Sequence, residues 1–99
     1  MESENLILIE HFCLYNRVDI SFIDALNNIG LIECIEIENN KYLKNEQLKN
    51  LEKMIEFHYL LNINIEGIEV IDNLLNQINT LQQELARAHN KLSIFESDF

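Results

Sequence analysis

The sequence predicts a mainly α-helical winged helix-turn-helix with a small β-hairpin wing, followed by a C-terminal helix that dimerises as a coiled coil. Two short helical patterns precede Gly30, an alternating apolar and acidic stretch follows it, and an apolar heptad pattern occupies the last third of the chain. With 99 residues, 47% of them hydrophobic, the chain can bury a modest core and gains stability by pairing with a second copy.

The helix-turn-helix is expected in the segment that ends at Gly30. One face of the first helix is apolar, with Ile9, Phe12 and Cys13. Asp19 or Ser21 is expected to cap the second helix, because a side-chain oxygen there accepts a free N–H group of the first turn. Gly30 is expected to end that helix, since glycine adopts the left-handed conformation without a steric penalty. The second helix carries apolar residues at helical spacing: Phe22, Ile23, Leu26 and Ile29.

The residues after Gly30 predict a two-stranded wing, because Ile32, Cys34, Ile35 and Ile37 interleave with glutamates. Asn39-Asn40 is expected to form the hairpin turn, since asparagine tolerates positive φ. A third helix is expected over residues 45–61, with Asn45 as its cap. A fourth is expected to run from a cap at Asn64 to about residue 93.

The fourth helix carries the clearest local pattern. Its a positions are Ile71, Ile78, Leu85 and Leu92, and its d positions are Leu74, Leu81, Ala88 and Phe95. A seam this regular indicates a partner helix. We therefore expect a homodimer through Ile71, Leu74, Ile78, Leu81, Leu85, Ala88 and Leu92. The expected domains are residues 1–62, the winged helix-turn-helix, and residues 63–99, the dimerising helix.

The charge distribution conflicts with the usual DNA-binding role of this fold. Seventeen acidic residues against seven basic ones give a net charge of −10. No Lys or Arg occurs from Val18 to Asn40, the stretch that contains the expected recognition helix and most of the wing. Affinity for duplex DNA depends on basic side chains that neutralise phosphates. The sequence therefore argues against direct DNA binding and favours a basic protein partner.

No catalytic or metal-binding pattern stands out, so neither an enzymatic activity nor a cofactor is expected. His11, His58 and His89 are scattered and lack the spacing of zinc ligands; His58 is expected to be structural, with one ring nitrogen satisfied. Cys13 and Cys34 are expected to be buried reduced thiols. No apolar run approaches the ~18 residues of a membrane span, and none resembles a signal peptide. These features predict a cytoplasmic protein without a membrane partner.

The order of elements and several motifs resemble MerR-type regulators and, within that superfamily, the chaperone modulator CbpM family. The matching segments are residues 10–14 (EHFCL), 29–33 (IGLIE), 58–61 (HYLL) and 62–68 (NINIEGI), within a likeness over about residues 6–93. The start of the last helix, with Asn64 and Gly67, is the most specific part. One departure is Arg17, which stands where a glycine is common in the superfamily.

The resemblance implies a partner and a mechanism. Members of that family bind the J-domain of a CbpA-type, DnaJ-like co-chaperone, block its stimulation of the chaperone DnaK, and can suppress its DNA binding. On that basis we expect a contact surface on the second helix, with Asp19 and Asp24 as charge partners and Asn28 as a hydrogen-bonding residue at the rim. Phe22 is either an exposed anchor or a core residue. The alternative is that these residues only form a solvated face.

Two other functions stay open at this point. One is a MerR-like transcription regulator that binds DNA as a dimer, and the other is a dimeric scaffold with a different client. The first predicts a basic patch in which Arg17, Lys41, Lys44 and Lys49 converge. Antiparallel pairing of the dimer helices also follows from the resemblance.

Overall fold

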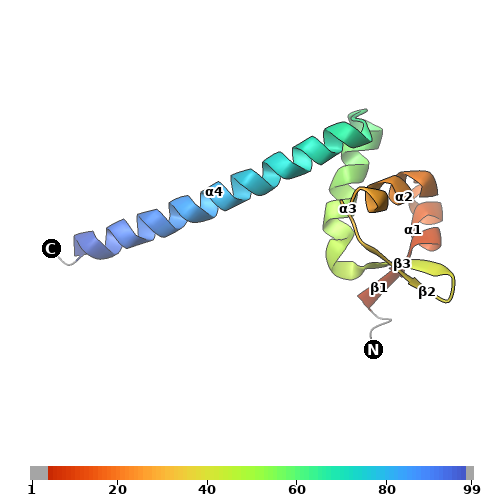
Figure 1. Cartoon of the computed structure of the whole chain (residues 1–99), viewed down its shortest axis with the longest axis horizontal. Helices are drawn as coiled ribbons and strands as arrows, with labels where there is room; N and C mark the ends of the chain where they lie inside the picture. Colours follow the sequence, from red (N-terminus) through yellow and green to blue (C-terminus); the bar gives the residue numbers. More distant parts are fainter. Residues whose placement is uncertain (1–4, 98–99) are drawn as a thin grey trace. The chain divides into compact units, whose positions relative to one another are not determined.

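The computed structural model describes residues 5–97 and has the predicted fold class (Figure 1). The chain divides into two compact units, Met1–Ile68 and Glu69–Phe99. The assignment of dimerisation to residues 63–99 stays a prediction. The elements are β1 (Leu6–Leu8), α1 (Ile9–Asn16), α2 (Ile20–Asn28), β2 (Cys34–Ile37), β3 (Asn40–Lys44), the 3₁₀ helix η2 (Asn45–Gln47), α3 (Leu48–Ile55), the π-helix η3 (Glu56–Leu60) and α4 (Ile65–Ser97).

The small sheet of the first unit has the strand order β1-β3-β2, and both of its pairings are antiparallel. The wing is therefore extended by β1, whose pairing with β3 the sequence did not indicate. Side chains of a strand alternate between the two faces of a sheet. Leu43 of β3 is fully buried, so its face lies toward the core, while its neighbour Tyr42 belongs to the opposite face.

The hairpin turn lies one residue earlier than predicted. Glu38 and Asn39 have positive φ angles of 51° and 68°, and Ile37 pairs with Asn40. Two positive φ angles are typical of a two-residue type I′ turn. This register places Leu43 opposite Cys34, whereas a turn at Asn39-Asn40 would place Leu43 opposite a glutamate. Cross-strand packing thus prevails over the preference of Asn for the turn.

Both helices of the helix-turn-helix end in a left-handed residue. At the end of α2, Gly30 has φ 83°, its N–H group donates to Asn27 O at 3.1 Å, and Leu31 N–H donates to Leu26 O at 2.9 Å. These bonds form a Schellman motif and confirm the predicted helix end. At the end of α1, Arg17 adopts φ 56° and ψ 48°. The turn geometry is therefore kept without a glycine, although a side chain in this conformation is strained.

The start of α4 confirms the predicted cap at Asn64. Asn64 Oδ1 accepts a hydrogen bond from Gly67 N–H at 2.7 Å, and a Cβ atom at Gly67 would lie 2.8 Å from Ile63 Cγ2. Glycine is required there because the capping residue and its neighbour close over the helix start. The sequence motif at this position thus encodes a local packing arrangement.

Two other predicted caps are wrong. Asn45 begins η2, and Lys44 precedes it without a capping bond. Asp19 occupies the N-cap position of α2, but its carboxylate makes no capping bond. Its backbone N–H group instead donates to Tyr59 Oη at 3.0 Å, which ties α2 to η3. The expected single helix over residues 45–61 consists of η2, α3 and η3 in succession.

The core of the first unit joins the helix-turn-helix, the sheet and α3. His58 has the expected structural role: its Nδ1 lies 3.0 Å from Ile63 O, and its ring stacks on Phe22 with centroids 4.4 Å apart. Tyr59 contacts the Phe22 ring edge-on at 5.6 Å. The buried hydrophobic residues are Ile9, Cys13, Val18, Phe22, Ile23, Leu26, Ile32, Leu43, Leu51, Met54 and Ile68.

Candidate interaction surface on the helix-turn-helix and wing

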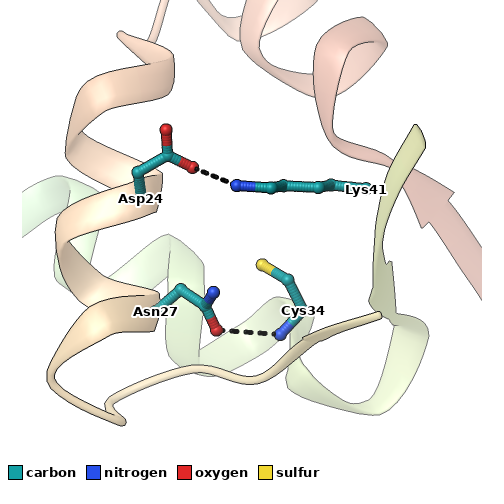
Figure 2. A network of polar contacts seen from close by, with 4 residues as sticks. All are labelled: Asp24, Asn27, Cys34 and Lys41. Atoms are coloured by element: carbon teal, nitrogen blue, oxygen red, sulfur yellow. Dashed lines mark hydrogen bonds and ion pairs between the residues drawn. The ribbon is translucent and has the colours of Figure 1, made fainter. Parts of the chain in front are cut away.

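Two side chains of α2 hold the wing against the helix-turn-helix (Figure 2). Asp24 Oδ1 lies 3.2 Å from Lys41 Nζ on β3, and Asn27 Oδ1 accepts a hydrogen bond from Cys34 N–H on β2 at 3.1 Å. The ion pair is partly exposed and therefore adds little stability, whereas the amide bond satisfies a half-buried backbone donor. Together they make α2 and the wing one continuous surface.

The four residues expected to contact a partner have different environments. Asp19 and Asn28 are exposed, so both are available to a partner. Asp24 is half-buried and forms an ion pair with Lys41. Phe22 is only 5% exposed and occupies the core, the second of its two expected roles. The surface of α2 therefore offers charge and hydrogen bonds, but Phe22 gives it no apolar anchor.

Sequence reasoning missed two polar residues that shape this surface. Asn27 is one, and Gln47 of η2 is the other: Gln47 Oε1 accepts from Glu33 N–H at 2.9 Å, and Gln47 Nε2 donates to Glu33 O at 3.3 Å. This pair of bonds fixes the segment that leads into β2. No periodicity reveals such contacts, because each joins a side chain to a backbone group of a distant segment.

A family model described as "MerR HTH family regulatory protein" matches residues 7–90. The chain belongs to this family. Comparisons with curated proteins and with solved structures gave no significant match. The family match confirms the superfamily part of the resemblance and agrees with the helix-turn-helix, wing and long terminal helix of the structure.

The basic residues of this MerR-family wing do not converge on one face. Lys41 and Lys44 are three positions apart on β3, so their side chains leave opposite faces of the sheet. Lys41 is paired with Asp24, which removes its charge from any phosphate-binding patch. Exposed carboxylates follow along the same segments: Asp19, Glu33, Glu36 and Glu38. The arrangement is electrostatically unfavourable for a DNA backbone and favourable for a cationic surface.

The expected dimer residues of α4 form an apolar stripe. Ile71 is half-buried and Ala88 is exposed. The larger side chains of the stripe are strongly exposed, with Leu74 at 51%, Ile78 at 49%, Leu81 at 62%, Leu85 at 71% and Leu92 at 57%. The side chain of Phe95, the last expected d residue, lies outside the described part. Exposure of such a stripe is typical of one strand of a coiled coil considered without its partner.

Both cysteines are free thiols in environments that suppress ionisation. Cys13 is buried, whereas Cys34 is only half-buried, less than expected. Burial raises the pKa of the Cys13 thiol, and the nearby carboxylates of Asp24 and Asp19 raise it further. Burial also raises the pKa of Cys34, although Lys41 partly opposes this effect. Cys13 belongs to the buried core and Cys34 packs against it. A raised pKa makes a thiol a poorer nucleophile and metal ligand at neutral pH.

Within residues 5–97, no helix is both long enough and apolar enough to cross a membrane. In the same part of the chain, no group of three or more His, Cys, Asp or Glu side chains is arranged to hold a metal ion.

Proposed function

We propose that this MerR-family protein is a chaperone modulator that binds the J-domain of a CbpA/DnaJ-like co-chaperone and inhibits it. The observation that carries the proposal is the charge of the α2–wing surface. This surface has the shape of a DNA reader, but no basic residue occurs over residues 18–40, and Lys41 is neutralised by Asp24. The motifs that resemble the CbpM family support the same partner.

Electrostatics and occlusion provide the mechanism. A J-domain has a basic helix that leads into the His-Pro-Asp loop through which it contacts DnaK. Carboxylates such as Asp19 would attract that helix and speed the encounter, with Asn28 as a hydrogen-bonding group at the rim. A modulator bound there would cover the loop and prevent stimulation of DnaK. Asp24 contributes less than a free carboxylate because it already contacts Lys41.

We also propose that the protein acts as a homodimer through the stripe on α4. Pairing two such stripes would remove Leu81, Leu85 and their apolar neighbours from water, which is the main driving force for coiled-coil formation. The antiparallel orientation rests on the resemblance to the MerR superfamily. A dimer would present two α2–wing surfaces, each able to bind one J-domain.

Calorimetric titration of the full chain with a purified CbpA-type J-domain tests the function, with DnaK ATPase stimulation as the activity readout. We expect a complex at low salt that weakens as salt rises, and loss of stimulation on complex formation. Asp24→Lys should weaken binding, because it replaces a carboxylate with a second ammonium group beside Lys41, and both repel a basic helix. Lys41→Ala should preserve or strengthen binding, because it frees the Asp24 carboxylate for the partner. Absence of a complex at low salt would refute the proposal.

The family match supports a MerR-like regulator and so is also compatible with one competing function, a transcription regulator that binds DNA as a dimer. A gel-shift series with promoter DNA at increasing salt separates the two. The modulator hypothesis expects no shift at physiological ionic strength, since the carboxylates of the α2–wing surface repel phosphates. A specific shift that weakens steeply with salt would favour the regulator.

A further inference from the structure

The sheet of the first unit has a second apolar face. The pairing register places Leu6, Leu8, Ile35, Ile37 and Tyr42 on the face opposite Leu43. Leu43 is fully buried, whereas Ile37 is 44% exposed, so the second face is not part of the core. We call it the outer face of the sheet.

A groove of about 670 Å³ lies along the outer face. Leu6 of β1 and Ile35 and Ile37 of β2 contribute its apolar lining, and the segment of residues 44–46 contributes polar and charged groups. Binding sites generally combine an apolar floor with a few charged groups that select the ligand. The groove has both features, and its lining contains no residue of α2 or of the stripe on α4.

The shape of the sheet favours a helix as the occupant. An added strand at the β2 edge is blocked at Cys34, because its N–H group already donates to Asn27 of α2 at 3.1 Å (Figure 2). Neighbouring strands lie about 4.8 Å apart, so the edge strands β1 and β2 are separated by roughly 10 Å. One α-helix with its side chains has a diameter of about 10–12 Å. A single helix therefore matches the width of the outer face.

The charges around the groove favour a cationic occupant. Glu46 is in its lining, and Glu38 directly follows Ile37 at the wing tip. Glu33 directly precedes β2, and its backbone is held by Gln47. The groove thus has Lys44 and Glu46 in its lining, with Glu33 and Glu38 just before and just after β2. A helix with Lys or Arg beside its apolar stripe would complement this pattern.

A second apolar patch in the same unit does not match such a partner. Leu14 is 82% and Tyr15 is 91% exposed on α1. This patch also includes Arg17, whose charge would oppose a cationic helix. A substitution in this patch is therefore a suitable control for substitutions in the groove.

We propose that the outer face of the sheet docks one cationic amphipathic helix of a protein partner. The apolar stripe of that helix packs on Leu6, Ile35 and Ile37, and its basic residues face Glu38 and Glu46. The assignment rests on the proposed function, because the basic helix of a J-domain has this chemistry. The helix would then dock on the outer face rather than on α2, because Phe22 of α2 is buried and apolar anchors carry most of the affinity of protein interfaces. The carboxylates of α2 would act on the encounter.

Titration of the J-domain into three variants of the full-length protein tests the proposal. Ile37→Lys removes an apolar contact and adds repulsion, so Kd should rise about tenfold or more. Glu46→Lys should raise Kd by roughly threefold to tenfold and reduce the salt dependence. Leu14→Lys makes the same kind of change on α1 and should leave Kd unchanged. Tyrosine fluorescence verifies that each variant is folded, and sedimentation compares the oligomeric state.

The outcomes separate this proposal from the proposed function. If the wild-type protein does not bind the J-domain, both fall. If it binds and both groove variants bind equally well, the function stands and the groove assignment is overturned. Weaker binding by Leu14→Lys alone would move the anchor to α1. A change of oligomeric state in Ile37→Lys would identify the occupant as a second copy of the chain, which also overturns the proposal.

Discussion

The two units of the chain use the same kind of apolar pattern in opposite ways. In the first unit the large apolar side chains Ile23, Leu26, Leu43, Leu51 and Ile68 are fully buried. In the second, the large a and d residues from Leu74 to Leu92 are 49–71% exposed. Both sets follow regular spacing along their elements. Periodicity therefore identifies the face to be covered, but not whether the chain itself or a second copy covers it.

The strongest expected effect concerns the stripe on α4. Leu81→Asp would place one unpaired carboxylate from each chain within the seam, where water does not solvate it. We expect at least a hundredfold weaker dimerisation, equivalent to about 3 kcal/mol. Sedimentation equilibrium over a concentration series measures the change.

The matched control is Gln83→Asp, which adds the same charge at the f position, away from the seam. It should leave the dimer intact. A dimer that survives Leu81→Asp would place the interface elsewhere on the molecule. Equal weakening by both substitutions would point to repulsion between acidic chains rather than to packing.

The next effect concerns the closed core of the first unit. Leu43 is fully buried, so Leu43→Ala should lower the free energy of unfolding by about 2–5 kcal/mol. Leu14→Ala, at a side chain 82% exposed, should change it by less than about 0.5 kcal/mol. Urea titration followed by tyrosine fluorescence is selective, because Tyr15, Tyr42 and Tyr59 all belong to the first unit.

If the two units are independent, Leu43→Ala should leave the dimerisation constant unchanged under conditions in which the first unit is folded. Weaker dimerisation of the folded variant would mean that the first unit contributes to the interface. The two units would then not be independent in the way their burial patterns indicate. Equal destabilisation by the Leu14 and Leu43 substitutions would contradict the core itself.

The features predicted correctly from the sequence have local causes. Gly30 ends α2 through hydrogen bonds that involve only the backbone of nearby residues, and Asn64 caps α4 through a bond to a residue three positions away. The fold class follows from the spacing of apolar residues, and the stripe on α4 from one helix considered alone. Such features depend on interactions within a few residues, which a pattern along the chain encodes.

The errors involve partners that are distant in the sequence. The wing turn shifted by one residue because Leu43 pairs with Cys34, and the Asp19 backbone binds Tyr59, 40 positions away. For Phe22 the sequence left open an exposed or a core role, and it lies in the core because His58 and Tyr59 cover it. The ion pair of Asp24 with Lys41 likewise joins segments that are distant in the sequence. The overall acidity of the candidate surface was predictable from composition, whereas the burial of Phe22 was not, since burial depends on the assembled fold.

The smallest expected effect refines the first unit at the turn of its helix-turn-helix. Arg17 has φ 56°, a conformation that costs a residue with a side chain about 1–2 kcal/mol. Glycine removes this strain but loses about 0.5–1 kcal/mol more conformational entropy on folding. Arg17→Gly should therefore raise the free energy of unfolding by about 0.5–1 kcal/mol. Tyrosine fluorescence during urea titration measures it.

Leu14→Gly is the control for this substitution, because Leu14 lies three residues earlier within α1 and is 82% exposed. There glycine should destabilise the unit by about 0.8 kcal/mol, since it relieves no strain and only weakens the helix. Opposite signs at two positions in one turn would show that the backbone of Arg17, not its charge, limits stability. Destabilisation by both substitutions would instead mean that the Arg17 side chain makes a contact that outweighs its strain. In either case the dimer constant should stay unchanged, because the effect is confined to the unit that covers its own apolar face.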